Sequence, residues 1–273
     1  MKNIFTALTV FAAFTAPAFA ADMAPYTKAP VAPPVPVVNW TGCYIAGGGG
    51  YGLWNQENAL FDNRTAVRTQ LVAETTAGGR GWFGTVGGGC DYQMPLGNWN
   101  VVVGAFGDYD WAGMKGRVAV PFAGAFDYGY EKLDTQWSVG GRVGALVSPS
   151  LLVYLSAGYT EAHFTGFNFL NGAAANGPIG APTAFYISGQ TYKGWFIGSG
   201  YEYALNFLPG LFWKTEYRFS DLDTQSNPVR VLATGALAGG GAGLDYDSHK
   251  YVQTIRSELV YRFNWGGSAV PRY

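Results

Sequence analysis

The segment 250–263, KYVQTIRSELVYRF, alternates two kinds of side chain with a period of two. Alternate residues of a β-strand point to opposite faces, so this segment predicts a strand with two unlike faces. One face is mostly apolar and has aromatic residues at both ends: Tyr251, Gln253, Ile255, Ser257, Leu259, Tyr261 and Phe263. The other face carries the charged series Arg256, Glu258 and Arg262. We expect the apolar face to contact lipid and the charged face to line a closed barrel.

Seven other segments are strand-like, and with 250–263 they make eight expected strands. They are 42–54, 81–93, 98–111, 133–147, 151–164, 191–205 and 211–224. Each exceeds the roughly 9–11 residues that a tilted strand needs to cross the hydrocarbon of a bilayer. The weakest is 42–54, where apolar character hardly separates the two faces.

The connections between these strands alternate between short and long. The short ones are 94–97, 148–150 and 206–210, and the long ones are 55–80, 112–132, 165–190 and 225–249. Structureless loops beyond about 12–15 residues are uncommon in compact soluble domains. Short turns on one side and long loops on the other are typical of outer-membrane barrels. The sequence therefore predicts an all-β fold, an eight-stranded antiparallel up-and-down transmembrane β-barrel.

The inward positions of the expected strands collect ionisable residues. They are Asp91, Asp108, Asp110, Arg142, Glu202, Lys214, Glu216, Arg218, Arg256, Glu258 and Arg262. A lone buried charge is strongly unfavourable, so the near balance of acids and bases predicts a paired network in the lumen. Asp108 and Asp110 are expected to pair with Arg142 and other lumenal bases. Because an eight-stranded barrel is only wide enough for its own side chains, we expect no wide aqueous channel.

The first residues have the pattern of an export signal. A basic start, an apolar stretch and Ala18-Phe19-Ala20 predict a signal peptide over 1–20 that is cleaved after Ala20, which indicates export through the Sec pathway. The Pro-rich segment 21–39 is expected to be a periplasmic leader; whether it enters the barrel is open. Residues 40–265 are the expected barrel and 266–273 a C-terminal tail.

Composition agrees with a β membrane protein and excludes a nucleic-acid partner. Charged residues make up 13% of the chain, against about 25% in soluble domains. The formal net charge of −1 offers no basic footprint for nucleic acid. We therefore expect contact with outer-membrane lipid and lipopolysaccharide, and with extracellular partners through the loops.

The two cysteines lie where one hairpin would bring them together. Cys43 opens the first expected strand and Cys90 lies near the end of the second, both with outward parity. Opposed residues of antiparallel strands are close enough for a disulfide, and an oxidising periplasm favours pairing. We expect a Cys43–Cys90 disulfide; the alternative is two free thiols facing lipid.

No catalytic, cofactor or metal site is expected. Gly47-x-Gly49-x-x-Gly52 matches a dinucleotide fingerprint in form but lacks the helix that must follow it. The two histidines, His163 and His249, lie at loop edges near Glu161 and Asp247 without a nucleophile–base–orienter set.

Two stretches resemble a known family. Trp40-Thr41-Gly42-Cys43-Tyr44-Ile45 with Gly50-Tyr51-Gly52-Leu53-Trp54, and Tyr261-Arg262-Phe263-Asn264-Trp265, resemble small alphaproteobacterial outer-membrane barrels. These porin-family or opacity-type proteins are similar to the OmpA transmembrane domain. The resemblance implies an eight-stranded barrel with a structural or surface-interaction role and no catalysis. The cysteine pair and the tail after Phe263 depart from the family pattern.

Two other functions stay open at this point. One is a narrow ion-conducting porin, which would show a stable single-channel conductance. The other is a soluble lipocalin-like ligand-binding barrel, which would have its apolar face inward. The residues do not indicate the oligomeric state or any loop partner.

Overall fold

The computed structural model describes residues 38–122 and 125–263. The expected signal peptide, the leader up to residue 37 and the C-terminal tail lie outside the described residues. Within the described ranges, no helix has the length and hydropathy needed to span a bilayer.

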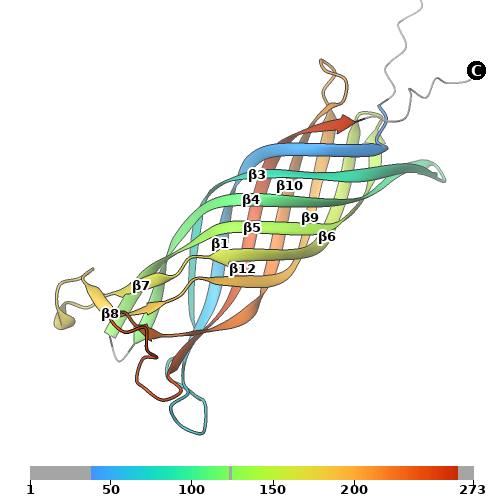
Figure 1. Ribbon diagram of the computed structural model, residues 1–273. Coiled ribbons are helices and arrows are strands. Elements are labelled where there is room, and N and C mark those ends of the chain that lie inside the picture. The colour runs from blue at the N-terminus through green and yellow to red at the C-terminus, as the bar shows by residue number, and fades with distance from the viewer. Residues whose placement is uncertain (1–37, 123–124, 264–273) are drawn as a thin grey trace, which may run out of the picture. The chain divides into compact units, whose positions relative to one another are not determined.

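Eight long antiparallel strands form a closed ring, which confirms the expected fold class. The ring order is β5-β4-β3-β1-β12-β10-β9-β6, and β6 pairs back to β5 (Figure 1). The strands are β1 Gly42–Asp62, β3 Thr75–Leu96, β4 Trp99–Phe122, β5 Ala125–Ser148, β6 Leu151–Phe164, β9 Gln190–Ala204, β10 Leu211–Pro228 and β12 Leu244–Phe263.

The first and last strands meet along their whole length. β1 pairs with β12 from Cys43 opposite Phe263 to Asp62 opposite Leu244, and with β3 on its other edge. The weak side-chain pattern of β1 reflects its glycines: a Cβ added at Gly48 or Gly50 would collide with the backbone of β12. Glycine at these inward positions therefore permits the close approach and curvature that a small barrel needs.

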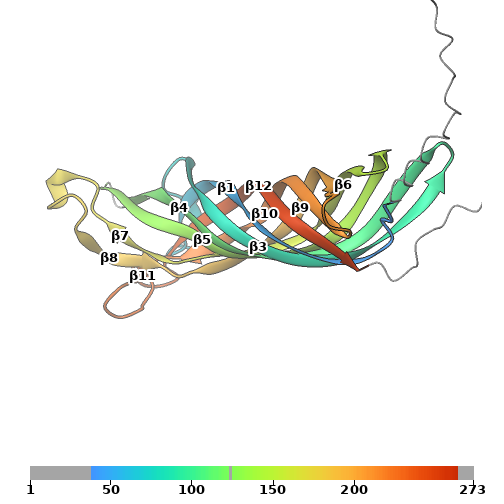
Figure 2. The same cartoon turned by 90° about the horizontal axis from the view of Figure 1, so that it is seen from above.

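The two ends of the barrel differ. Short turns at 97–98, 149–150 and 205–210 gather at one end, and Gly97 and Gly210 supply the positive φ angles of +60° and +83° that two of these turns use. The other end carries β2 Thr69–Gln70, β7 Phe167–Leu170, the 3₁₀ turn η1 Ala174–Asn176, β8 Pro182–Ile187 and β11 Arg230–Val231. Figure 2 shows β7, β8 and β11 gathered at that end. In outer-membrane barrels the short turns are periplasmic and the long loops extracellular.

The expected long loops are shorter than the sequence pattern indicated. The prediction of a loop over 112–132 is wrong, because β4 continues to Phe122 and β5 begins at Ala125. The period of two persists there and even-numbered positions stay inward, as the buried Met114 and Val118 show. The outward side changes from apolar to polar, because Lys115 and Arg117 are exposed. β1, β3, β10 and β12 likewise extend beyond their expected extracellular ends.

The outer surface has an apolar zone bounded by aromatic side chains. On β12, Ile255 is 55% exposed, and Leu259, Tyr261 and Phe263 are exposed on the same face; Tyr251 shares that face and is half-buried. Trp82 on β3 is 74% exposed and Trp111 on β4 is also exposed, both near the extracellular side of this zone. Such aromatic girdles mark the boundary between hydrocarbon and water in outer-membrane barrels.

Candidate functional site

The lumen is the candidate site, because all eleven sequence-predicted ionisable side chains point into it and are buried there. They come from β3, β4, β5, β9, β10 and β12 and form two groups plus one separate pair. Their contacts decide whether the lumen is an open passage or a filled interior.

The group nearer the periplasmic end joins two guanidinium groups to two carboxylates. Arg142 Nε donates to Asp91 Oδ1 at 2.9 Å, and its Nη1 donates to Glu202 Oε2 at 3.1 Å. Arg262 Nη1 donates to Asp91 Oδ2 at 2.7 Å, and its Nη2 donates to Glu202 Oε1 at 2.7 Å. The two positive and two negative charges cancel within the group. Each charge therefore has the partner that burial requires.

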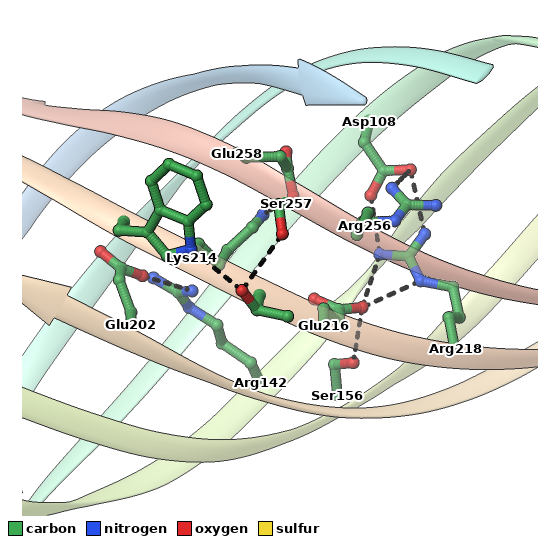
Figure 3. A network of polar contacts seen from close by, with 12 residues as sticks. Asp108, Arg142, Ser156, Glu202, Lys214, Glu216, Arg218, Arg256, Ser257 and Glu258 are labelled. Carbon is green, nitrogen blue, oxygen red and sulfur yellow. Dashed lines mark hydrogen bonds and ion pairs between the residues drawn. The ribbon is translucent and has the colours of Figure 1, made fainter. Parts of the chain in front are cut away.

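The second group lies farther toward the extracellular end and is built on β4, β10 and β12 (Figure 3). Arg218 binds Asp108 through two nitrogen–oxygen contacts of 3.0 and 2.9 Å, and its Nε donates to Glu216 Oε1 at 3.0 Å. Arg256 reaches Asp110 at 2.9 Å and Asp108 at 3.2 Å. The bidentate geometry suits the planar guanidinium.

The partners within these groups differ from expectation. Asp108 and Asp110 pair with lumenal bases as expected, namely Arg218 and Arg256. The prediction that Arg142 is among these partners is wrong, because Arg142 lies with Asp91 and Glu202 on their periplasmic side. The strand tilt of a barrel sets which inward residues share a level, and sequence parity carries no information about it.

A separate pair and neutral partners complete the middle of the lumen. Lys214 Nζ lies 2.7 Å from Glu258 Oε2 across the β10–β12 pair. Tyr154 donates its hydroxyl to Glu216 at 2.8 Å, and Ser156 donates to the same carboxylate at 3.2 Å. The period of two within 151–164 puts Tyr154 and Ser156 on one face, but it does not indicate that they donate to Glu216.

Sequence reasoning missed a further ion pair near the extracellular end. Lys250 Nζ lies 2.8 Å from Glu131 Oε2, and it also contacts Gln56 Oε1. Three aromatic rings surround the ammonium group, with centroids 4.5–5.3 Å from Nζ: Phe164, Tyr192 and Trp54. Such contacts stabilise a cation at the ring faces.

The reason for the missed pair differs for its two members. Lys250 shares the parity of Arg256 and could have been found by extending the inward face of 250–263 by one period. Glu131 could not, because the β5 register shifts between Leu133 and Thr135. Buried positions are odd-numbered up to Leu133 and even-numbered from Gln136.

Apolar side chains fill both ends of the lumen. At the periplasmic end Trp40 is fully buried, with its ring 4.8 Å from that of Phe212 and its indole Nε1 donating to Pro149 O at 3.2 Å. At the extracellular end Trp54 donates to Met114 O at 3.0 Å and lies against Phe164. The charged middle therefore lies between two apolar layers.

The cysteines and histidines lie outside the lumen. Cys43 and Cys90 are directly opposed on β1 and β3 and form a disulfide on the outward face. His249 Nε2 lies 2.7 Å from Asp221 Oδ1, and His163 Nδ1 lies 3.2 Å from Thr191 Oγ1 on a different strand pair. Among residues 38–122 and 125–263, no three His, Cys, Asp or Glu side chains are placed to hold a metal ion.

The extracellular loop 63–74 has its own ionic contacts. Arg64 donates to both oxygens of Asp62, at 2.9 and 2.7 Å, and lowers the pKa of that carboxyl to about 2. Arg68 Nη2 lies 2.6 Å from Asp247, and the guanidinium stacks over Phe61 at 3.9 Å. These contacts hold the loop against the ends of β1 and β12.

The sequence was compared with family models and with known proteins. No family model matches the sequence. The 31 kDa outer-membrane immunogenic protein of Brucella melitensis is 30% identical over 226 residues, covering 81% of this chain and 88% of the relative. The protein of the same description from Brucella suis gives the same values.

Solved structures share the architecture. The outer membrane protein OprG from Pseudomonas aeruginosa is 12% identical, with a TM-score of 0.50; the match covers 84% of this chain and 100% of OprG. The outer membrane protease OmpT from Escherichia coli is 12% identical, with a TM-score of 0.40; the match covers 81% of this chain and 97% of OmpT. The first likeness supports the fold, and the second carries no argument about activity. The chain therefore belongs to the family of the 31 kDa outer-membrane immunogenic proteins of Brucella, and it is a small outer-membrane β-barrel.

Proposed function

We propose that this barrel is a closed structural element of the outer membrane that offers an interaction surface outside and has no wide channel. The observation that carries the proposal is the interlocked filling of the lumen. Arg142, Arg218, Arg256 and Arg262 each reach across the interior to carboxylates on other strands. Close-packed interiors leave few voids larger than a water molecule, so this filling favours a closed barrel.

The extracellular end supports an interaction role. Its connections expose large apolar side chains to water: Val67, Leu71, Ile179 and Leu232. They come from three different connections between the long strands. Exposed apolar side chains contribute to partner binding when they gather on one surface. Extracellular partners are therefore the contacts that we propose for this end.

The experiment compares solute uptake with ionic conductance. Purified protein is reconstituted in liposomes and in planar bilayers, with a general porin as positive control and protein-free membranes as negative control. We expect disaccharide-driven swelling at the protein-free rate and no stable conductance step. Brisk disaccharide uptake would overturn the closed-lumen proposal. A reproducible conductance without disaccharide uptake would replace it with the narrow ion-conducting porin.

We also propose the division of the chain into a signal peptide over 1–20, a periplasmic leader over 21–39, the barrel over 40–265 and a tail over 266–273. Trp40 is buried, its carbonyl accepts a hydrogen bond from Arg262, and Val38 packs nearby. These contacts support a barrel that begins near residue 40. Mass spectrometry of protein extracted from outer membranes should find Ala21 as the first residue. A chain that retains residues 1–20 would contradict the cleavage.

A further inference from the structure

Basic side chains that lack an ionic partner gather on one sector of the outer surface. Among the described residues, ten lysine and arginine side chains form ion pairs with carboxylates. The lysine and arginine side chains without such a pair in those ranges are Arg80, Lys115, Arg117 and Arg230. Three of these, Arg80, Lys115 and Arg117, lie together on the outward face of β3 and β4. We call these three residues the basic sector.

The pairing of the strands forces like charges together in this sector. Arg80 is directly opposite Lys115 across the β3–β4 pair, and Lys115 is opposite Lys132 across the β4–β5 pair. Opposed side chains have Cβ atoms about 4.5–5.5 Å apart, and like charges at that spacing are destabilising. Lys132 has a carboxylate partner, Asp134, at 2.5 Å, whereas Arg80 and Lys115 have none among the described residues. An external anion would relieve this repulsion.

The sector lies where lipid headgroups would be. On β3, Arg80 shares the outward face of Trp82 and lies two residues closer to the extracellular end. On β4, Lys115 lies closer to the extracellular end than Trp111. Trp82 and Trp111 belong to the aromatic girdle, which sits at headgroup level in outer-membrane barrels. The level of the basic sector is therefore that of the headgroups of the outer leaflet.

Nearby aromatic rings hold two of these cations against the barrel wall. Lys115 Nζ lies 5.2 Å from the ring centroid of Tyr130, and the Arg117 guanidinium carbon lies 4.4 Å from that of Tyr128. Stacking orders a long side chain while its N–H groups remain available, so these cations can bind an anion at a smaller entropic cost.

The rest of the outward surface at this level has a different charge pattern. Glu161 lies 3.8 Å from Lys193 on β6 and β9, and Asp221 lies 2.7 Å from His249 on β10 and β12. Glu57 projects from β1 opposite His249. At this level of the outward surface, unpaired positive charge among the described residues is thus confined to β3 and β4, since Arg230 lies on β11 in an extracellular connection.

The lipid face beside the sector also leaves room for an acyl chain. Gly84 and Gly113 lie near Trp82 and Trp111 on the outward face. A Cβ at Gly84 would meet its first neighbour at 4.0 Å, and one at Gly113 at 3.4 Å, so packing within the barrel does not demand glycine there. The missing side chains make the surface between the two indoles shallow and open to lipid.

We propose that the basic sector is a binding site for the phosphate groups of the outer-leaflet glycolipid, lipopolysaccharide, with an acyl chain lying beside Trp82 and Trp111. Guanidinium groups bind phosphate oxygens through paired hydrogen bonds, and the ammonium group adds a point charge. This site goes beyond the closed-lumen proposal and does not rest on it. A barrel that conducts ions could carry the same site.

The test measures how much lipid the purified full-length barrel retains in detergent, by native mass spectrometry. The probes are lipid A with its phosphates and the same lipid after phosphate removal, and inorganic phosphate at equal concentration serves as competitor. The variant is Arg80→Gln with Lys115→Gln and Arg117→Gln. The matched control, Arg64→Gln with Arg68→Gln and Arg230→Gln, removes the same charge from the extracellular loops. Heat-modifiable gel migration confirms that each barrel is folded.

We expect wild-type protein to retain phosphorylated lipid A and to lose about tenfold or more of that retention in the basic-sector variant, because charge-assisted hydrogen bonds are removed. The loop control should match wild type, and inorganic phosphate should not displace the lipid. Equal retention by the basic-sector variant, or an equal loss in the loop control, would overturn the proposal. So would equal retention of dephosphorylated lipid by wild type, a result that needs no variant to fold, or displacement by inorganic phosphate, which would indicate a free-anion site.

Discussion

The lumen has an ionic half, which runs from the apolar layer around Trp40 through the middle, and an apolar half toward the extracellular end. In the ionic half, Arg142, Arg262, Arg218 and Arg256 are neutralised by carboxylates on facing strands. Toward the extracellular end the filling is aromatic and aliphatic, with the single Lys250–Glu131 ion pair inside an aromatic cage. The difference teaches that a membrane barrel can have an apolar core of its own where its strands extend beyond the hydrocarbon. There the outward face meets headgroups and water and takes the charges, as Lys115 and Arg117 do.

The largest effect should come from removing one cation of the ionic half. Arg262→Met leaves Asp91 and Glu202 without one of their two guanidinium partners and removes the hydrogen bond to Trp40 O. We expect the free energy of unfolding in urea to fall by about 3–5 kcal/mol, because uncompensated charge is left buried. The exposed ion pair of Arg64 and Asp62 provides the control, and Arg64→Met should change stability by less than about 1 kcal/mol. Equal losses in the two variants would mean that the buried network contributes nothing special.

The apolar half should respond to lost volume. Phe164 is fully buried between Trp54 and Tyr192. Phe164→Ala should lower the free energy of unfolding by about 3–4 kcal/mol, because it removes apolar contacts and leaves a cavity. The same urea titration measures it, and Phe219→Ala, on the outward face, is the comparison. A loss at Phe164 no larger than that at Phe219 would argue against a packed extracellular core.

Removing the disulfide tests how much of the barrel's stability comes from this covalent bond at the periplasmic end, in addition to the packing of the lumen. Cys43 and Cys90 close a segment with a sequence separation of 47, which includes the first extracellular loop. Replacing both by Ser should lower the free energy of unfolding by about 2–4 kcal/mol, because the unfolded chain gains freedom. Reduction of wild-type protein should reproduce the loss, and reduction of the double variant should have no effect. A change on reduction of that variant would assign the effect to something other than this bond.

The smallest effect should come from exchanging the cage ion pair for neutral groups. Lys250→Met with Glu131→Gln keeps side-chain volume and removes both buried charges together. We expect a change within about 1 kcal/mol in either direction, since replacing both members of a buried ion pair by neutral groups of similar volume leaves no unpaired buried charge. Lys250→Met alone should lose more stability, because Glu131 then lacks its partner. If the single variant proved as stable as the double one, the ionic interaction in the cage would be negligible.

Period-two alternation predicted the fold because lipid outside and charge inside give each strand two unlike faces. It identified the strands around Arg142, Arg218 and Arg256, and it brought Cys43 and Cys90 into one hairpin. The prediction failed where the two faces of a strand no longer differ as apolar outside and charged inside. Beyond Trp111 the outward side becomes polar, so the predicted strands end too early. The register shift near Leu133 changes which positions face inward, so Glu131 was not identified. Trp40 precedes the first strand, and its buried position depends on Phe212 and Pro149, which are distant in the chain.

The central claim is that the apolar side chains face lipid while the charged ones are enclosed. Spin labels on single cysteines along β12, in the Cys43→Ser and Cys90→Ser background, test it without altering any charge. Three sites are outward, Gln253, Ile255 and Leu259, and three are inward, Val252, Thr254 and Val260. In lipid bilayers, oxygen collision rates should be high at the three outward sites and low at the three inward ones. Rates that are higher at Val252, Thr254 and Val260, or that show no alternation, would contradict the account.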